Sequence, residues 1–387
     1  MPATACGPDV FKNRHHSAKL TARTVEIGEL IDSAPVIERI QLMTHDLKLG
    51  LALGYWGSGQ PSGHAEAVAL AEELRFDSIW TAEAYGSDAL TPLAWLGSQT
   101  SSVRLGTAII QMSARTPAAT AMAAMTMDHL SGGRFVLGIG ASGPQVVEGW
   151  YGQPYPKPLT RTREYVAILR QAFQREKLAF EGEHYQLPIR GGAGLGKSLR
   201  STLHPVRADI PILLAAEGPK NVALAAEIAD GWIPLFYSPF DDAHYRAALA
   251  EGWSRPGART TAESFEVPCI VKVEVDDDVE AAADRVRPFL ALYIGGMGAK
   301  GANFHYEVFA RMGYEAECAT IQDLYLDGRK DEAIASVPLS LVEKVALVGP
   351  KAKISDELAA WRESLLTTML VNDQPSTMRI MAELVGG

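Results

Sequence analysis

The sequence of 387 residues predicts an α/β fold of the (β/α)8-barrel class. From residue 47 onward, segments with the hydrophobic period of a strand alternate with segments that have the period of a helix. Such alternation is typical of parallel strands joined by helices. Eight segments of the first kind can be recognised, which is the number that closes this barrel. Single barrels of about 250 residues grow past about 400 with insertions, so one domain suffices.

The predicted strands are short apolar runs, most of them bounded by glycine, proline or polar residues. A helical pattern over residues 62–74 follows the first strand, and Ser62 is its expected N-cap. The eight predicted strands are 48–54, 77–81, 103–110, 135–139, 210–215, 232–236, 265–275 and 367–371.

Helices are predicted in the intervals. Apolar residues spaced i, i+3, i+4, i+7 indicate helices around 165–172 and 222–229. Three helices are expected to carry a proline in the first turn, in Thr91-Pro92, Thr116-Pro117 and Gly218-Pro219. Proline is favoured in a first turn because its missing N–H would have no helical partner there.

Three segments depart from the alternation. Residues 1–46 are predicted to be a flexible N-terminal appendage, which leaves 47–387 for the barrel. Residues 142–209 and 279–366 are each longer than one helix requires, so we predict insertions after strands four and seven. Loops after barrel strands form the functional face, and the first insertion is therefore expected to build part of a substrate pocket.

Composition excludes several classes of protein. A net charge of -10 without a basic stripe disfavours nucleic acid as a partner. Three isolated cysteines and scattered histidines indicate neither disulfides nor a metal site. No run approaches the ~20 apolar residues of a membrane span, and the start lacks a secretion signal. We expect a cytoplasmic protein that acts on a small molecule.

Two glycine-rich motifs imitate nucleotide sites. Residues 191–198, GGAGLGKS, match a P-loop, but no long strand precedes them and little room for a helix follows, so a mobile glycine-rich lid is favoured. Gly138, Gly140 and Gly143 match GxGxxG, yet Pro144 follows and no helix is expected before about Thr160. We therefore disfavour a Rossmann fold, while the glycines can still let backbone approach a planar ligand.

Residues 215–220, AAEGPK, lead from a strand directly into a helix start. Exposed amides and the helix dipole favour an anion there by about 0.3 to 1 kcal/mol, and Lys220 could add a charge. A phosphate site and an ordinary tight turn both remain open for this segment.

Five segments together carry a family resemblance: LKLGLALGYWG, DSIWTAEAYGSD, RLGTAII, LSGGRFVLGIGASGP and AAEGPKNVALAAEIADGW. They are similar to the luciferase-like monooxygenase superfamily over roughly residues 47–239. Within it, the chain resembles oxidoreductases that use the deazaflavin coenzyme F420, relatives of methylenetetrahydromethanopterin reductase. The resemblance implies a luciferase-like TIM barrel with the cofactor at its carboxyl-terminal mouth, and a homodimer.

The resemblance also implies positions for the cofactor. Glu83 would contact the polar edge of the ring, and Thr107, Ala108 and Ile109 would form a bulge behind it. A non-prolyl cis peptide is expected between Ala108 and Ile109. The remaining expected cofactor-binding residues are Gly138, Gly140, Ala141, Ser142 and Gly143 beside the ring and tail, and Ala216, Glu217, Gly218 and Pro219 near the phosphate.

For catalysis, the candidates are Glu83, Tyr85 and Trp56, although Tyr85 and Trp56 could equally line the rim. Relatives that oxidise alcohols or sugar phosphates carry histidine where this chain has Ala84. Alcohol oxidation needs a base, so the expected reaction is hydride transfer from reduced F420 to an unidentified small organic substrate. The alternatives are an FMN-dependent monooxygenase and a non-catalytic flavin-binding protein.

Overall fold

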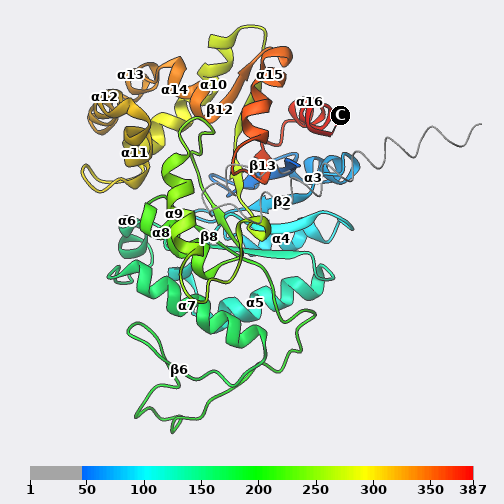
Figure 1. Cartoon of the computed structure of the whole chain (residues 1–387), viewed down its shortest axis with the longest axis vertical. Coiled ribbons are helices and arrows are strands. Elements are labelled where there is room, and N and C mark those ends of the chain that lie inside the picture. Colours follow the sequence, from blue (N-terminus) through cyan, green and yellow to red (C-terminus); the bar gives the residue numbers. More distant parts are fainter. Residues whose placement is uncertain (1–45, 387) are drawn as a thin grey trace, which may run out of the picture. The chain divides into compact units, whose positions relative to one another are not determined.

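The computed structural model describes residues 46–386; the predicted appendage lies almost entirely outside them. Eight parallel strands of the described part form one sheet in the order β10-β13-β1-β2-β3-β5-β8-β9. The sheet closes at Glu266, whose O accepts from Trp232 N at 2.8 Å and whose N donates to Asp230 O at 3.1 Å. The predicted (β/α)8 barrel is therefore confirmed (Figure 1).

The barrel strands lie close to their predicted positions. The predicted third strand is interrupted at residues 108–109, after which a short strand, β4 (Ile110–Gln111), continues beside β5. The barrel strands are β1 (Lys48–Gly54), β2 (Ser78–Thr81), β3 (Arg104–Thr107), β5 (Phe135–Gly140), β8 (Ile212–Ala215), β9 (Gly231–Ile233), β10 (Pro268–Ile270) and β13 (Thr368–Val371).

The barrel interior is filled by alternate residues of the strands, as the two-residue period of a strand requires. A buried interior cluster contains Trp80, Val136, Leu213, Ile233 and Leu370. Smaller or partly exposed side chains lie against this cluster, and we call them the floor: Ala52, Ala108, Ile109, Ala215 and Ile270. The floor comes from the carboxyl halves of the strands, so it faces the mouth of the barrel.

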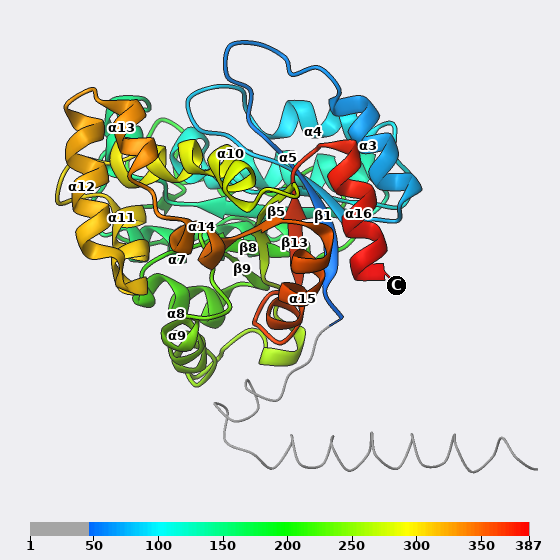
Figure 2. The same cartoon turned by 90° about the horizontal axis from the view of Figure 1, so that it is seen from above.

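The helices surround the sheet, and α16 packs beside α3 near the C-terminus (Figures 1 and 2). The three prolines lie in first turns as predicted: Pro117 and Pro219 each begin a helix, and Pro92 is the third residue of α4, which begins at Leu90. The expected cap Ser62 is also wrong, because α3 starts one residue later behind Gly63, whose φ is 86°. The helices outside the two insertions are α3 (His64–Glu73), α4 (Leu90–Gly97), α5 (Pro117–Leu130), α8 (Pro219–Ile228), α9 (Ala243–Trp253) and α16 (Pro375–Gly386), with short 3-10 turns η1 (Met112–Ala114) and η2 (Ala262–Ser264).

The first insertion contains a barrel helix and a hairpin. Helix α7 (Pro158–Phe173) packs between α5 and α8, and β6 (Phe180–Glu181) pairs with β7 (Gln186–Leu187). A short helix, α6 (Pro144–Gly149), starts directly after Gly143, so the expectation of no helix before residue 160 is wrong. Pro144 explains the start, because proline is accepted in a first turn.

Neither glycine-rich motif has the context of a nucleotide site. Strand β5 lies inside the closed barrel between β3 and β8, which rules out a Rossmann arrangement. Residues 191–198 follow the two-residue strand β7, and no helix intervenes between them and β8. Residues 191–198 therefore lack the strand and helix of a P-loop, as predicted.

The predicted seventh strand, 265–275, is divided in the structure. Its first part is β10, whereas β11 (Lys272–Val275) pairs in parallel with β12 (Ala346–Gly349) outside the barrel. Residue Val273 of β11 and Val348 of β12 are fully buried, and α10 packs on both strands. The apolar run 265–275 extends beyond the barrel because its second part packs in a small second core with β12 and α10. Strand β12 was not predicted.

The second insertion is a helical lobe with its own core, which includes Val286, Leu290, Phe309, Ile321 and Leu341. Helices α11 to α14 gather on one side of the barrel in both views (Figures 1 and 2). Besides β12, the lobe and its continuation consist of α10 (Val279–Ala291), π-helix η3 (Leu292–Gly296), α11 (Phe304–Phe309), π-helix η4 (Ala310–Tyr314), α12 (Glu315–Leu326), α13 (Lys330–Ala335), α14 (Leu339–Val345) and α15 (Lys351–Arg362). No helix of residues 46–386 is long and apolar enough to span a bilayer.

Close packing at Gly138 gives a stability prediction. A Cβ added there would lie 1.8 Å from the carbonyl oxygen of Thr107, which is backbone and cannot yield easily. We expect Gly138→Ala to lower the free energy of unfolding by about 2 kcal/mol or more in urea titrations. Gly149→Ala is the control, since nothing lies within 4 Å of its added Cβ and the change should be neutral. Equal stabilities of the two variants would contradict the prediction.

Candidate active site

The mouth of the barrel offers a shallow apolar floor. The peptide bond between Ala108 and Ile109 is cis, as expected, and both residues are partly exposed at this end. A Cβ at Gly140 would come within 2.7 Å of Ile109 Cδ1, so a larger residue where β5 passes the bulge would require the Ile109 side chain to move. The floor thus has room for a flat ligand above small side chains.

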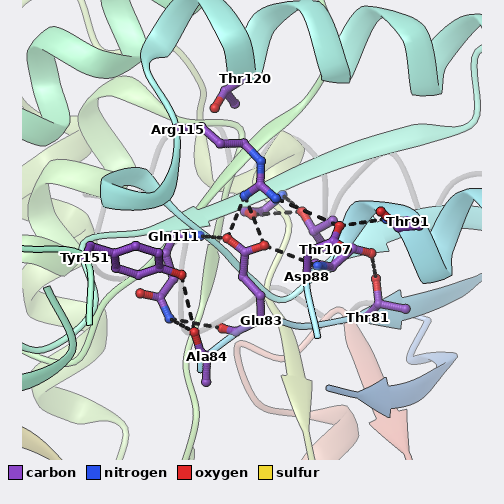
Figure 3. Close-up of polar contacts among 12 residues, drawn as sticks. Thr81, Glu83, Ala84, Asp88, Thr91, Thr107, Gln111, Arg115, Thr120 and Tyr151 are labelled. Carbon is purple, nitrogen blue, oxygen red and sulfur yellow. Dashed lines mark hydrogen bonds and ion pairs between the residues drawn. The ribbon is translucent and has the colours of Figure 1, made fainter. Parts of the chain in front are cut away.

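Glu83 holds together the loops that follow β2 and β3 (Figure 3). Its Oε1 accepts from Arg115 Nη1 at 2.7 Å and from the backbone N of Gln111 at 2.9 Å. Its Oε2 accepts from the backbone N of Ala89 at 3.2 Å. Burial opposes the charge of Arg115, but the hydrogen bond and charge of Glu83 outweigh it and raise the pKa of Arg115. Glu83 is buried, so this structure gives it a positioning role; its contact with a ring remains a prediction.

Three further side chains near Glu83 are also engaged in contacts within the protein. The hydroxyl of Thr107 donates to Gly138 O at 2.8 Å and accepts from Gly138 N at 3.0 Å, and this side chain is fully buried. Gln111 Nε2 and the hydroxyl of Tyr151 both donate to the carbonyl of Ala84, at 3.2 and 3.3 Å. The sequence analysis did not identify Arg115 or Gln111, because nothing in their local pattern marks a long-range partner.

The two aromatic candidates line the rim. Trp56 is partly exposed, and its backbone N donates to Ser87 Oγ at 2.9 Å. Tyr85 is 52% exposed, and its hydroxyl lies 3.9 Å from the sulfur of Met297. Glu148 is exposed on α6. Only Tyr85 among these presents an exposed hydroxyl beside the mouth.

The second insertion reaches the mouth at three loops. Met297 meets Tyr85 after β2, and the ring of Phe304 lies 3.3 Å from a Cβ placed on Gly143 after β5. Arg311 Nη2 donates to Glu217 O, after β8, at 3.2 Å.

The first insertion was expected to build part of the pocket, and this remains a prediction. Its Tyr151 does contact the loop after β2, at Ala84. Its hairpin is instead tied to α7, where Glu164 accepts from the backbone N of residues 183, 184 and 185 at 2.6, 2.8 and 3.0 Å. Both insertions therefore contact loops around the mouth, and the reach of the second follows only from three-dimensional packing.

The segment after β5 is strained at one residue. Ser142 has a φ of 60°, and its carbonyl accepts from the hydroxyl of Tyr155 at 2.8 Å. Ala141 lines a small pocket with Tyr155 and Arg161, among other residues. Non-glycine residues in this conformation gather at functional sites, which agrees with the expected place of residues 141–143 beside a ligand.

The turn after β8 combines an open helix start with a buried acid. Gly218 and Pro219 begin α8, and Pro219 is exposed, so the first amides of the helix can meet an anion. Ala216 O accepts from the indole N of Trp232 at 2.7 Å. The Glu217 carboxyl points inward instead, and its Oε1 accepts from Leu235 N at 3.0 Å.

Burial raises the pKa of Glu217 to about 7, although the Leu235 N–H and the charge of Arg311 act in the opposite direction. Its Oε2 is buried and has no hydrogen-bond partner. The carboxyl is therefore largely neutral below pH 7, and an anion at the start of α8 would not meet a full negative charge there.

Comparison with known proteins identifies the family. The model of the luciferase-like monooxygenases matches residues 49–368. The chain belongs to this family. A Mycobacterium tuberculosis protein with the provisional name coenzyme F420-dependent oxidoreductase is 54% identical over 347 residues, covering 89% of this chain and 100% of that protein.

Two further proteins are similar to the chain. The 5,10-methylenetetrahydromethanopterin reductase of Archaeoglobus fulgidus is 32% identical over 230 residues, which are 59% of this chain and 65% of the reductase. The coenzyme F420-dependent tetrahydromethanopterin reductase of Methanopyrus kandleri has a solved structure that superposes with a TM-score of 0.72 at 22% identity, over 88% of this chain and 97% of that one. The superposition shows that the fold is shared.

The Glu83–Arg115 pair gives a second stability prediction. Arg115→Met leaves the buried carboxylate with backbone donors alone, and removing one partner of a buried pair is costly. We expect a loss of about 3 kcal/mol in the free energy of unfolding, measured by urea denaturation. Arg329→Met, which breaks the exposed pair with Glu332, should cost less than about 1 kcal/mol. A similar small loss for both variants would show that Glu83 does not depend on Arg115.

Glu217 gives a prediction for pH. Its pKa in the folded protein, about 7, lies above the ordinary value of 4.5, so the folded state holds the proton more tightly than the unfolded state. The contribution of Glu217 to stability is therefore lost as pH rises from about 4.5 through 7.

Glu217→Gln keeps an acceptor for Leu235 N and removes the titration. We expect the variant to melt at a higher temperature than the unaltered protein at pH 8, with a smaller difference at pH 5, in thermal scans followed by circular dichroism. Glu148→Gln, on the exposed face of α6, is the control. A Glu217→Gln difference that is the same at both pH values would refute the prediction.

Proposed function

We propose that this luciferase-like protein is an F420-dependent oxidoreductase that passes hydride from reduced F420 to a small organic substrate. The identity of 54% over the full length of a relative with that provisional name carries the proposal. The reducing direction is inferred from Ala84, since no imidazole stands at the position where oxidising relatives are expected to have one.

The residues at the mouth fit such a cofactor. Small side chains and the cis peptide at Ala108 and Ile109 leave a flat surface for a ring, and Gly140 keeps it open at β5. Gly218 and Pro219 would place the first amides of α8 near a phosphate. Reduced F420 supplies a hydride when it is bound, while the protein supplies orientation and electrostatics.

The chain's own groups then position the substrate and limit water. Met297, Phe304 and Arg311 contact three of the loops around the mouth, so the second insertion screens it from solvent. The carbonyl of Ala84 is occupied by Gln111 and Tyr151, which fixes the loop beside the floor. We propose that Tyr85, with its exposed hydroxyl, contacts the substrate.

Cofactor titration tests the proposal. We expect purified full-length protein to bind F420 at least about tenfold more tightly than FMN, measured by fluorescence quenching. Reduced F420 should then be oxidised on addition of members of a panel of carbonyl, imine and activated-alkene compounds, followed by absorbance with and without oxygen. Binding of FMN alone with oxygen-dependent turnover would favour a monooxygenase. Tight binding with no turnover across the panel would favour a non-catalytic protein.

A further inference from the structure

Two polar residues stand just beyond the floor on neighbouring strands. Ile270 of β10 pairs with Leu370 of β13, and both contact the interior cluster. The residues two positions after this pair lie just beyond the carboxyl ends of β10 and β13, at the point where β11 begins. These are Lys272 and Asn372, and both are partly exposed. The charge of Asp373, the neighbour of Asn372 in the chain, acts on Lys272, so the amine and the amide lie in the same region after the two strand ends.

Lys272 is a cation without a partner. Its Nζ lies 5.0 Å from the centre of the Phe289 ring, and residues 46–386 provide it with no hydrogen bond or ion pair. The two carboxylates whose charges act on it are engaged elsewhere, Glu274 with Arg285 at 3.0 Å and Asp373 with His64 at 3.5 Å.

Desolvation by burial lowers the pKa of Lys272, and the charges of Glu274 and Asp373 only partly oppose it. Phe289 packs against Tyr293, whose ring centre is 4.8 Å away, so an aromatic wall borders the amine on that side. A bound anion would give the Lys272 ammonium the ion pair and hydrogen bond that the protein itself does not provide.

Asn372 has a side-chain oxygen that lacks a hydrogen-bond partner. Its Oδ1 is buried and has no hydrogen-bond partner. Buried amide oxygens nearly always accept a hydrogen bond, so an unpartnered one beside an open mouth indicates an absent donor. A cation–π contact with Phe289 could account for Lys272 alone, but it leaves Asn372 unexplained.

We propose that Lys272 and Asn372 form a substrate-recognition pair for a carboxylate that carries a hydroxyl or N–H group on the adjacent carbon. The ammonium binds the carboxylate, and Asn372 Oδ1 accepts the hydrogen bond of the neighbouring group. One unpaired lysine matches a single negative charge better than a phosphate dianion, for which several donors are usual. The assignment to substrate rests on the proposed function, whereas the binding chemistry does not.

Small probes test the pair directly on the full chain. Glycolate offers a carboxylate with an adjacent hydroxyl, whereas acetate offers the carboxylate alone. We expect ligand-observed NMR titrations to show tighter binding of glycolate than of acetate. Lys272→Met should weaken both by about tenfold or more, since a charged hydrogen bond is lost. Asn372→Leu should remove the advantage of glycolate and leave acetate unchanged.

Lys48→Met is the matched control, because Lys48 begins β1 at the opposite end of the barrel and is 55% exposed. Lys272→Arg retains the charge and should still bind acetate, which keeps the test decisive if Lys272→Met does not fold. Equal glycolate affinity in Lys272→Met and the unaltered protein would overturn the proposal, as would an equal loss in Lys48→Met.

Parallel F420 titrations of the same proteins separate the two proposals. We expect Lys272→Met to retain its F420 affinity. Loss of F420 binding in this variant would assign the lysine to the cofactor and overturn the recognition pair. Failure of the unaltered protein to bind F420, with the glycolate results as expected, would reject the proposed cofactor and leave the pair standing.

Discussion

Closure of the sheet at Glu266 is the constraint on which the candidate site depends. Its backbone joins the last two neighbours of the barrel, and its carboxylate forms a bidentate pair with Arg104 of β3, at 2.7 and 2.8 Å. Burial opposes the charge of Arg104, but Glu266 and Asp77 raise the pKa of its guanidinium. Arg104 is the first residue of β3, four residues before Ala108, so the pair lies at the amino end of this strand. The pair fixes the amino end of the closed barrel. Because all eight strands are parallel, their carboxyl ends lie together at the other end and form one mouth.

The sequence predicts the local elements well because they depend on local periods. All eight barrel strands and the helix starts at Pro117 and Pro219 follow from alternation and from proline chemistry. The division of strand seven could not be predicted in this way, since residues 265–275 form one apolar run whichever partner they have. Its outer half pairs with β12 because the second core is there to receive it, and that core is a property of the folded lobe.

The same limit applies to the site. Resemblance placed Glu83, Ala108 and Gly140 around the mouth, where the structure has them, and named the cis peptide. It did not reveal that Arg115 neutralises Glu83, or that the Glu217 carboxyl turns inward to Leu235. Such partners lie far apart in sequence, and a single chain contains no signal that joins them.

The division of labour around the mouth bears on how such a protein can change. The floor is formed by Ala52, Ala108, Ile109, Ala215 and Ile270, and the Glu83–Arg115 bond fixes the loops beside it without any residue of the second insertion. That insertion carries a core of its own and contacts three loops around the mouth. Exchange of the lobe's surface residues can therefore alter which molecules enter while the platform beneath keeps its shape. The surroundings of the mouth can thus vary independently of the surface that they enclose.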